Sequence, residues 1–143
     1  NICFFLGRAF LYSSSPEDGL YYLDRVDSLL QPDPKTISAI YFYKQEIYNA
    51  IGRFEDALIN YQAAYKYNPN PEYIFYIASL HQYKLDNKNK AIEYYERFLS
   101  LLPSKPELKN IEDNRQITVS LKEAAEANIK YLKEQLFLKG KLN

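Results

Sequence analysis

Apolar residues recur along this chain at the three- and four-residue spacing of amphipathic helices, and no stretch shows the sustained alternation of a strand. The spacing predicts six helices before residue 102, joined by short polar or proline-containing turns. A longer seventh helix is expected after a segment without periodicity at 104–114. The expected helices cover residues 1–12, 16–30, 34–51, 54–67, 72–85, 90–101 and 115–139. The pattern therefore predicts an all-α fold with no sheet.

Turn chemistry supports these boundaries. A capping residue followed by proline occurs at Ser15-Pro16, Asp33-Pro34 and Asn70-Pro71, which is typical of helix starts. Gly52 allows a tight turn between two helices. For the last helix, we expect Asp113 or Asn114 to cap the start and Lys139, Gly140 and Lys141 to mark the end.

One apolar face of each helix is expected to be buried. From the second helix on, its members follow from spacing alone: Leu20, Leu23, Val26, Leu29 or Leu30, Ile40, Tyr41, Ile47, Tyr48, Ile51, Ala57, Leu58, Tyr61, Ala64, Ile74, Phe75, Ala78, Leu85, Ala91, Ile92, Tyr95, Phe98, Leu99, Ile117, Leu121, Ala125, Ile129, Leu132 and Leu136.

A 34-residue period relates two parts of the chain. Ala57, Tyr61 and Pro69 return as Ala91, Tyr95 and Pro103. With this period, the sequence resembles the tetratricopeptide repeat (TPR) family. The central repeat matches at Tyr41, Tyr48, Gly52, Phe54, Ala57, Tyr61, Ala64 and Pro69. The third matches at Phe75, Ala78, Ser79, Ala91, Tyr95 and Pro103, and the first at Leu6, Gly7 and Phe10. Lys44 and Gln45 depart from the family's Leu and Gly, and Phe98 replaces its second Ala.

The resemblance implies an α-α superhelix of antiparallel helix pairs, because stacked pairs bury apolar faces that one pair leaves open. The repeats would occupy 1–103, divided at about 1–34, 35–70 and 71–103. The loop 104–114 and a capping helix at 115–139 would complete the same domain.

Charge and composition narrow the possible classes of function. The formal net charge is zero, with 18 basic and 18 acidic residues, so the excess positive charge of a nucleic-acid binder is missing. Cys3 is the only cysteine and His81 the only histidine, and we expect both to serve packing. No metal-ligand spacing, phosphate loop or catalytic constellation is present, so we expect no enzyme and no cofactor.

The TPR resemblance implies a peptide or partner helix bound in an aromatic concave groove. By position, the groove residues would be Phe4, Arg8, Tyr12, Phe42, Glu46, Asn49, Tyr73, Tyr76 and Tyr83. The Lys and Asn of the family's carboxylate clamp are absent, so capture of a C-terminal carboxylate is not expected. The partner would be a protein, but its identity is not specified by the sequence.

Two alternatives stay open. The C-terminal helix or inter-repeat packing could cover the aromatic residues, leaving no groove. Alternatively, the chain could form a homodimer through the repeat edge or the C-terminal helix, where Leu132, Leu136, Phe137 and Leu138 supply extra apolar surface. No run of about 20 apolar residues predicts a membrane span. The chain starts without Met, as a fragment or processed form would, so cell envelope and cytoplasm are both compatible. The Tyr-, Asn- and Lys-rich style resembles exported bacterial TPR proteins.

Overall fold

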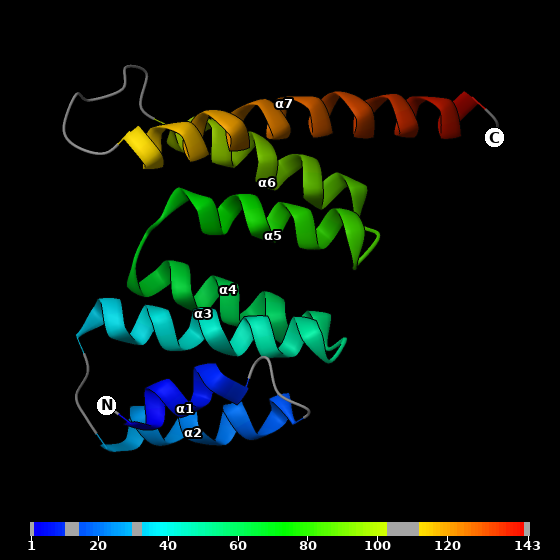
Figure 1. Ribbon diagram of the computed structural model, residues 1–143. Helices are drawn as coiled ribbons and strands as arrows, with labels where there is room; N and C mark the ends of the chain where they lie inside the picture. Colours follow the sequence, from blue (N-terminus) through cyan, green and yellow to red (C-terminus); the bar gives the residue numbers. More distant parts are fainter. Residues whose placement is uncertain (1, 11–14, 30–32, 103–111, 142–143) are drawn as a thin grey trace. The chain divides into compact units, whose positions relative to one another are not determined.

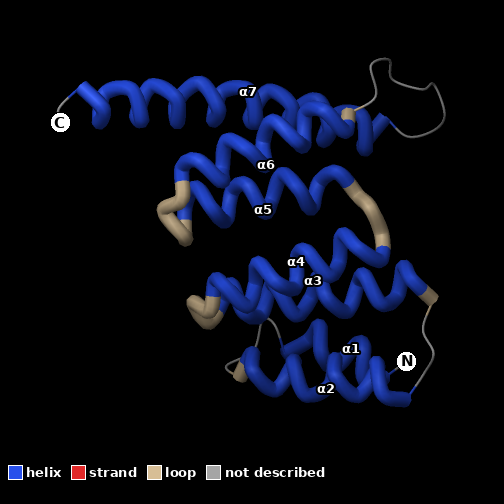
Figure 2. The backbone as a smooth tube through the Cα atoms, turned by 180° about the vertical axis from the view of Figure 1, so that it is seen from behind, coloured by secondary structure: helices blue, strands red, loops and turns tan. Residues whose placement is uncertain are grey.

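Helices account for nearly all of the chain that the computed structural model describes, namely residues 2–10, 15–29, 33–102 and 112–141. These residues form seven helices and no strand, which confirms the all-α prediction (Figures 1 and 2). The helices are α1 (Ile2–Phe10), α2 (Pro16–Leu29), α3 (Pro34–Ala50), α4 (Phe54–Tyr67), α5 (Pro71–Tyr83), α6 (Lys88–Leu101) and α7 (Glu112–Lys141). The chain divides into two compact units, Asn1–Tyr73 and Ile74–Asn143, with the division inside α5.

Two glycines let α1 and α2 approach closely in the first unit. A Cβ atom added to Gly7 would lie 2.6 Å from Cγ of Leu23, and one added to Gly19 would lie 2.8 Å from the carbonyl oxygen of Gly7. The same Gly19 position would bring a Cβ within 2.8 Å of Cδ1 of Ile47 in α3. The three helices therefore meet where neither glycine has room for a side chain.

The core of the first unit lies next to this contact. Leu23 and Val26 of α2 are buried together with Ile40 and Ile47 of α3. Cys3, Leu20 and Tyr43 pack around the cluster and are only partly covered. Cys3 thus serves packing, as the sequence predicted.

Local hydrogen bonds fix the ends of α3. Oδ1 of Asp33 accepts from the amides of Lys35 at 2.9 Å and Thr36 at 3.2 Å, which caps the first turn. At the other end, the Arg53 amide donates to the Tyr48 carbonyl at 2.8 Å, and the Gly52 amide donates to the Asn49 carbonyl at 3.2 Å. This pair of bonds is a Schellman motif. Gly52 supports it with a φ of 79°, which L side chains rarely adopt.

Aromatic packing dominates the second unit. The Phe75 ring of α5 meets the rings of Tyr95 and Phe98 of α6 edge-on, at centroid distances of 5.3 and 5.4 Å. Tyr95 and Phe98 are fully buried, and so is Ala91. Phe98 therefore fills the space between α5 and α6, at a position where the TPR pattern has a small residue.

The long helix α7 packs against α6. Ala125 and Leu132 are fully buried, as the spacing predicted. Nζ of Lys133 lies 2.7 Å from Oε1 of Glu96 on α6. Leu121, Ile129 and Leu136 are half-buried along the same face, and the side chain of Ile117 lies outside the described residues.

Several predicted helix ends are wrong. Helix α6 begins at Lys88 rather than Lys90, because Asn87 is the capping residue and accepts from the Lys90 amide at 3.1 Å. Helix α7 begins at Glu112, so Asp113 and Asn114 lie inside it and do not cap it. Acidic residues in the first turn suit the positive helix end. At its other end, α7 finishes at Lys141, within the predicted stop at Lys139, Gly140 and Lys141.

Candidate functional site

The predicted groove residues are divided between the two units. Arg8, Phe42, Glu46, Asn49 and Tyr73 belong to the first unit, and Tyr76 and Tyr83 to the second. Phe4 lies in α1 but its side chain is outside the described residues, as is all of Tyr12.

Phe42 of α3 is the centre of an aromatic cluster in the first unit. Its ring lies 6.4 Å from the Tyr61 ring of α4 and 5.8 Å from the Tyr73 ring, measured between centroids. Phe42 and Tyr73 are both half-buried, so each keeps part of its ring at the surface. The predicted groove aromatics thus pack against one another and still offer apolar surface.

Glu46 follows Phe42 by one helical turn and is half-buried. Burial raises the pKa of its carboxyl group, and the neighbouring Gln45 amide opposes that effect. Among the described residues, no Lys or Arg forms an ion pair with this carboxylate. Glu46 therefore carries a desolvation cost that no cation of the first unit offsets.

Gln45 stands where the TPR pattern has Gly, and the sequence predicted no role for this residue. The structure buries it to 1% exposure. It lies two turns after Ser38, whose hydroxyl donates to the Ala64 carbonyl of α4 at 2.9 Å, so both face α4. Neither amide atom of Gln45 makes a hydrogen bond to a described residue within the usual distance and angle limits. Gln45 therefore lowers the pKa of Glu46 through a contact weaker than a regular hydrogen bond.

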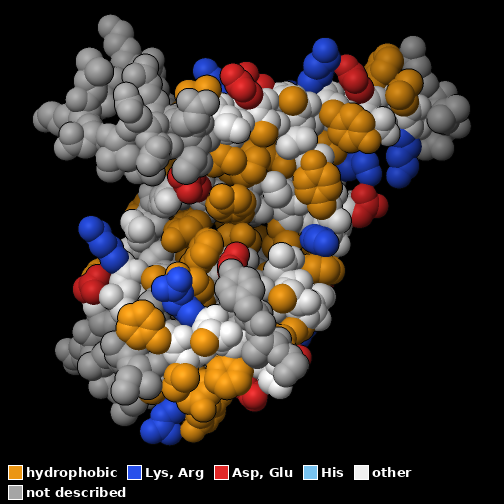
Figure 3. Space-filling model, in the orientation of Figure 1, with side chains coloured by type: hydrophobic (Ala, Val, Ile, Leu, Met, Phe, Trp, Pro, Cys, Tyr) orange, Lys and Arg blue, Asp and Glu red, His pale blue; other side chains and the backbone are white. Residues whose placement is uncertain are grey.

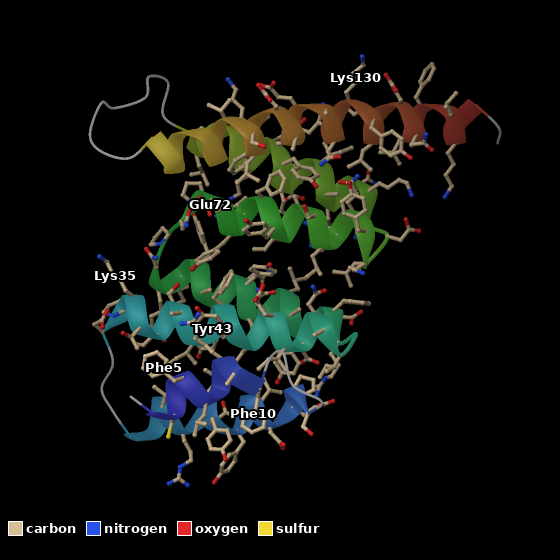
Figure 4. The ribbon with its side chains drawn as sticks, viewed as in Figure 1. Phe5, Phe10, Lys35, Tyr43, Glu72 and Lys130 are labelled. Carbon is tan, nitrogen blue, oxygen red and sulfur yellow. The ribbon has the colours of Figure 1, made fainter. Side chains whose placement is uncertain are left out.

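Arg8 and Asn49 are the remaining predicted groove residues of the first unit with described side chains. The guanidinium carbon of Arg8 in α1 is 4.7 Å from the centroid of the Tyr43 ring, a cation–π contact between α1 and α3. Figure 4 shows Tyr43 on the side of α3 toward α1. Asn49 is exposed one turn after Glu46. The first unit thus presents a row of Phe42, Glu46 and Asn49 along α3.

In the second unit, a polar network surrounds the buried Tyr95. Its hydroxyl donates to Oε1 of Gln82 at 2.8 Å and lies 3.1 Å from Oγ of Ser79. It also accepts from Nδ2 of Asn128 in α7 at 3.1 Å. The Tyr83 hydroxyl donates to Oδ1 of the same Asn128 at 3.4 Å. Burial raises the pKa of Tyr95, so the phenol stays protonated and keeps its donor.

This network was missed at the sequence level. Tyr95 was placed in the core by its spacing, but Ser79, Gln82 and Asn128 were not paired with it. The one available signal was Gln82, a polar residue where the TPR pattern has Tyr. Tyr83 is 65% exposed despite its bond to α7. The half-buried Tyr76 meets Phe75 edge-on at 5.8 Å.

His81 packs between α5 and α6. Its ring stacks on Tyr94 of α6 at 5.4 Å, and only 8% of the residue is exposed. Its buried Nδ1 has no hydrogen-bond partner among the described residues. Burial lowers the pKa of His81, nearby Lys90 lowers it further, and Glu93 opposes the shift. The histidine therefore favours its neutral form, as its predicted packing role requires.

The described part of the chain contains no group of three or more His, Cys, Asp or Glu side chains placed to hold a metal ion. Of its helices, none combines the length and the apolar character needed to cross a membrane. No protein-family model and no curated protein matches this sequence.

Proposed function

We propose that this chain is a non-enzymatic interaction module of the TPR type, and that α3 of its first unit binds a peptide or partner helix. Two features support the TPR type. Ala57 and Ala91, related by the repeat period, are both fully buried in the second helix of a pair. The turn before Ala57 has the glycine conformation that the repeat pattern calls for.

The observation that carries the binding site is the half-buried Glu46 carboxylate without a cation partner in the described structure. A ligand that brings a Lys or Arg side chain would offset its desolvation. Phe42, one turn earlier, offers a half-buried ring for an apolar or aromatic side chain. Asn49, one turn later, offers an exposed amide that can hydrogen-bond to an extended backbone or a side chain.

The ligand class follows from this row of side chains. It is a peptide segment or helix with a basic residue next to an apolar or aromatic one. A ligand with an acidic residue at that place would face the Glu46 carboxylate and be rejected. The site lies in the first unit alone, and Tyr76 and Tyr83 of the second unit are not needed for it.

The test uses the full chain to select from a displayed library of short random peptides. We expect enriched peptides to combine Lys or Arg with a neighbouring aromatic or apolar residue. Their affinity should fall about tenfold for Glu46→Gln and for Phe42→Ala, since a bond to a charged group or a buried ring contributes that much. Glu55→Gln is the matched control, because Glu55 is an exposed carboxylate in the first turn of α4. Enrichment of acidic peptides, no enrichment at all, or binding unchanged by both variants would refute the assignment.

A further inference from the structure

Helix α7 is much longer than the helix it packs against. It has 30 residues, whereas α6 has 14, and at 1.5 Å per residue it extends about 45 Å. The last fully buried residue of α7 is Leu132. Figures 1 and 2 show its C-terminal part continuing past α6. The C-terminal part of α7 thus leaves much of its surface uncovered within the second unit.

One flank of this helix carries apolar residues that face solvent. Tyr131 and Leu138 are each 53% exposed and stand two turns apart, so they lie on the same flank. Ala124 and Ala127 precede them on that flank, where Ala127 is exposed and Ala124 is half-buried. Hydrophobic side chains are visible at the surface of the C-terminal half of α7 (Figure 3). The flank therefore has large residues toward the C-terminus and small ones toward the N-terminus.

Two opposite charges border the same flank. Lys130 and Glu134 are exposed and take part in no ion pair of the described structure. Figure 4 shows Lys130 pointing away from α6. A lysine one turn before a glutamate is the less favourable order for pairing within a helix. Both charges are therefore available to a neighbouring molecule.

We propose that a second copy of this chain docks antiparallel on this flank of α7. Lys130 and Glu134 lie at equal distances from position 132, so a two-fold axis there brings Lys130 of one copy beside the partner's Glu134, twice. The same register inserts Leu138 between the partner's Ala124 and the partner's Ala127, so a large side chain meets two small ones. The two Tyr131 rings meet close to the axis. Such an interface is self-complementary, as a two-fold dimer requires.

Charge decides between this occupant and a membrane surface. An anionic lipid surface attracts flanks that carry only basic residues. Here Glu123, Glu126 and Glu134 are exposed along α7 together with the lysines. A helix that carries lysines and glutamates together fits its own antiparallel copy better than an anionic lipid surface. The proposal uses α7 alone and is independent of the peptide site on α3.

Sedimentation equilibrium of the full chain tests the proposal, with circular dichroism to verify that each variant keeps its helices. We expect the wild type to form a weak dimer. Lys130→Glu and Glu134→Lys each place like charges opposite one another at two symmetric points, so the dissociation constant should rise roughly tenfold. The double variant Lys130→Glu/Glu134→Lys exchanges the two charges and should return it to the wild-type value.

Two further variants isolate the apolar contact. Leu138→Glu should leave only monomer, because the charge would face the partner's alanines. Lys35→Glu is the control, since Lys35 is an exposed lysine on α3 without an ion pair in the described structure. This variant should leave the dissociation constant of the dimer unchanged. A wild type that stays monomeric at roughly 1 mM, a dimer that survives Leu138→Glu, or a double variant as weak as the single ones would overturn the proposal.

Discussion

Removal of the Tyr95 hydroxyl should loosen the docking of α7. In Tyr95→Phe, the buried ring and its contacts with Phe75 remain, but three hydrogen bonds disappear, to Ser79 at 3.1 Å, Gln82 at 2.8 Å and Asn128 at 3.1 Å. One such bond contributes about 1 kcal/mol net, so simple addition gives about 3 kcal/mol.

The expected cost is smaller than this sum. Gln82 and Asn128 are half-buried, so water reaches part of each side chain. They also keep their own contact, in which Nε2 of Gln82 lies 3.4 Å from Oδ1 of Asn128. We therefore expect a loss of about 2 kcal/mol in the free energy of unfolding. For a chain of this length, that corresponds to a fall of about 4–8 °C in Tm.

Thermal unfolding followed by circular dichroism measures the loss, and hydrogen exchange locates it. Amides of α7 near Asn128 should exchange faster in Tyr95→Phe, because the bond from α6 to α7 is gone. Tyr94→Phe is the matched control, a half-buried tyrosine on the same helix that stacks on His81. Equal stability of the two variants, or unchanged exchange in α7, would show that the network does not hold α7.

Three further predictions concern packing and protonation. Gly7→Ala should lower the free energy of unfolding, measured by urea titration, by about 1–3 kcal/mol, because the new methyl group forces Leu23 aside. Gly140→Ala is the control: no atom of the described structure packs within 4 Å of the new methyl group, so the free energy of unfolding should stay the same or rise slightly. Gln45→Leu should raise the free energy of unfolding by about 1 kcal/mol, since it removes two buried amide atoms without partners; a loss of stability would mean that Gln45 is hydrogen-bonded in solution. The fold lowers the pKa of His81. The contribution of the neutral imidazole to the free energy of unfolding is therefore complete above about pH 6.5 and declines as the pH falls through that lowered pKa. Urea titrations between about pH 7.5 and about pH 5 should show this decline in the wild type and a shallower one in His81→Gln.

The candidate site could be predicted from the sequence only in part. The TPR resemblance implies Phe42, Glu46 and Asn49 by position, and all three lie on α3 with part of their surface exposed. Spacing does not reveal that Phe42 contacts Tyr61 and Tyr73, because these rings come from other helices. Nor does it reveal which carboxylate lacks a cation, since that depends on every neighbour brought close by folding.

The sequence by itself determined the helices and most of their turns. Asp33-Pro34 starts α3 and Gly52 ends it through bonds to residues at most five positions away, and such local interactions do not need the rest of the fold. Only the tertiary structure decided which polar side chains are covered and what they meet. Asn128 bonds Tyr95 across 33 positions, and Gln45 is buried because α4 returns along α3. These contacts depend on the packing of helices against one another, and helical periodicity specifies a buried face without specifying its neighbour.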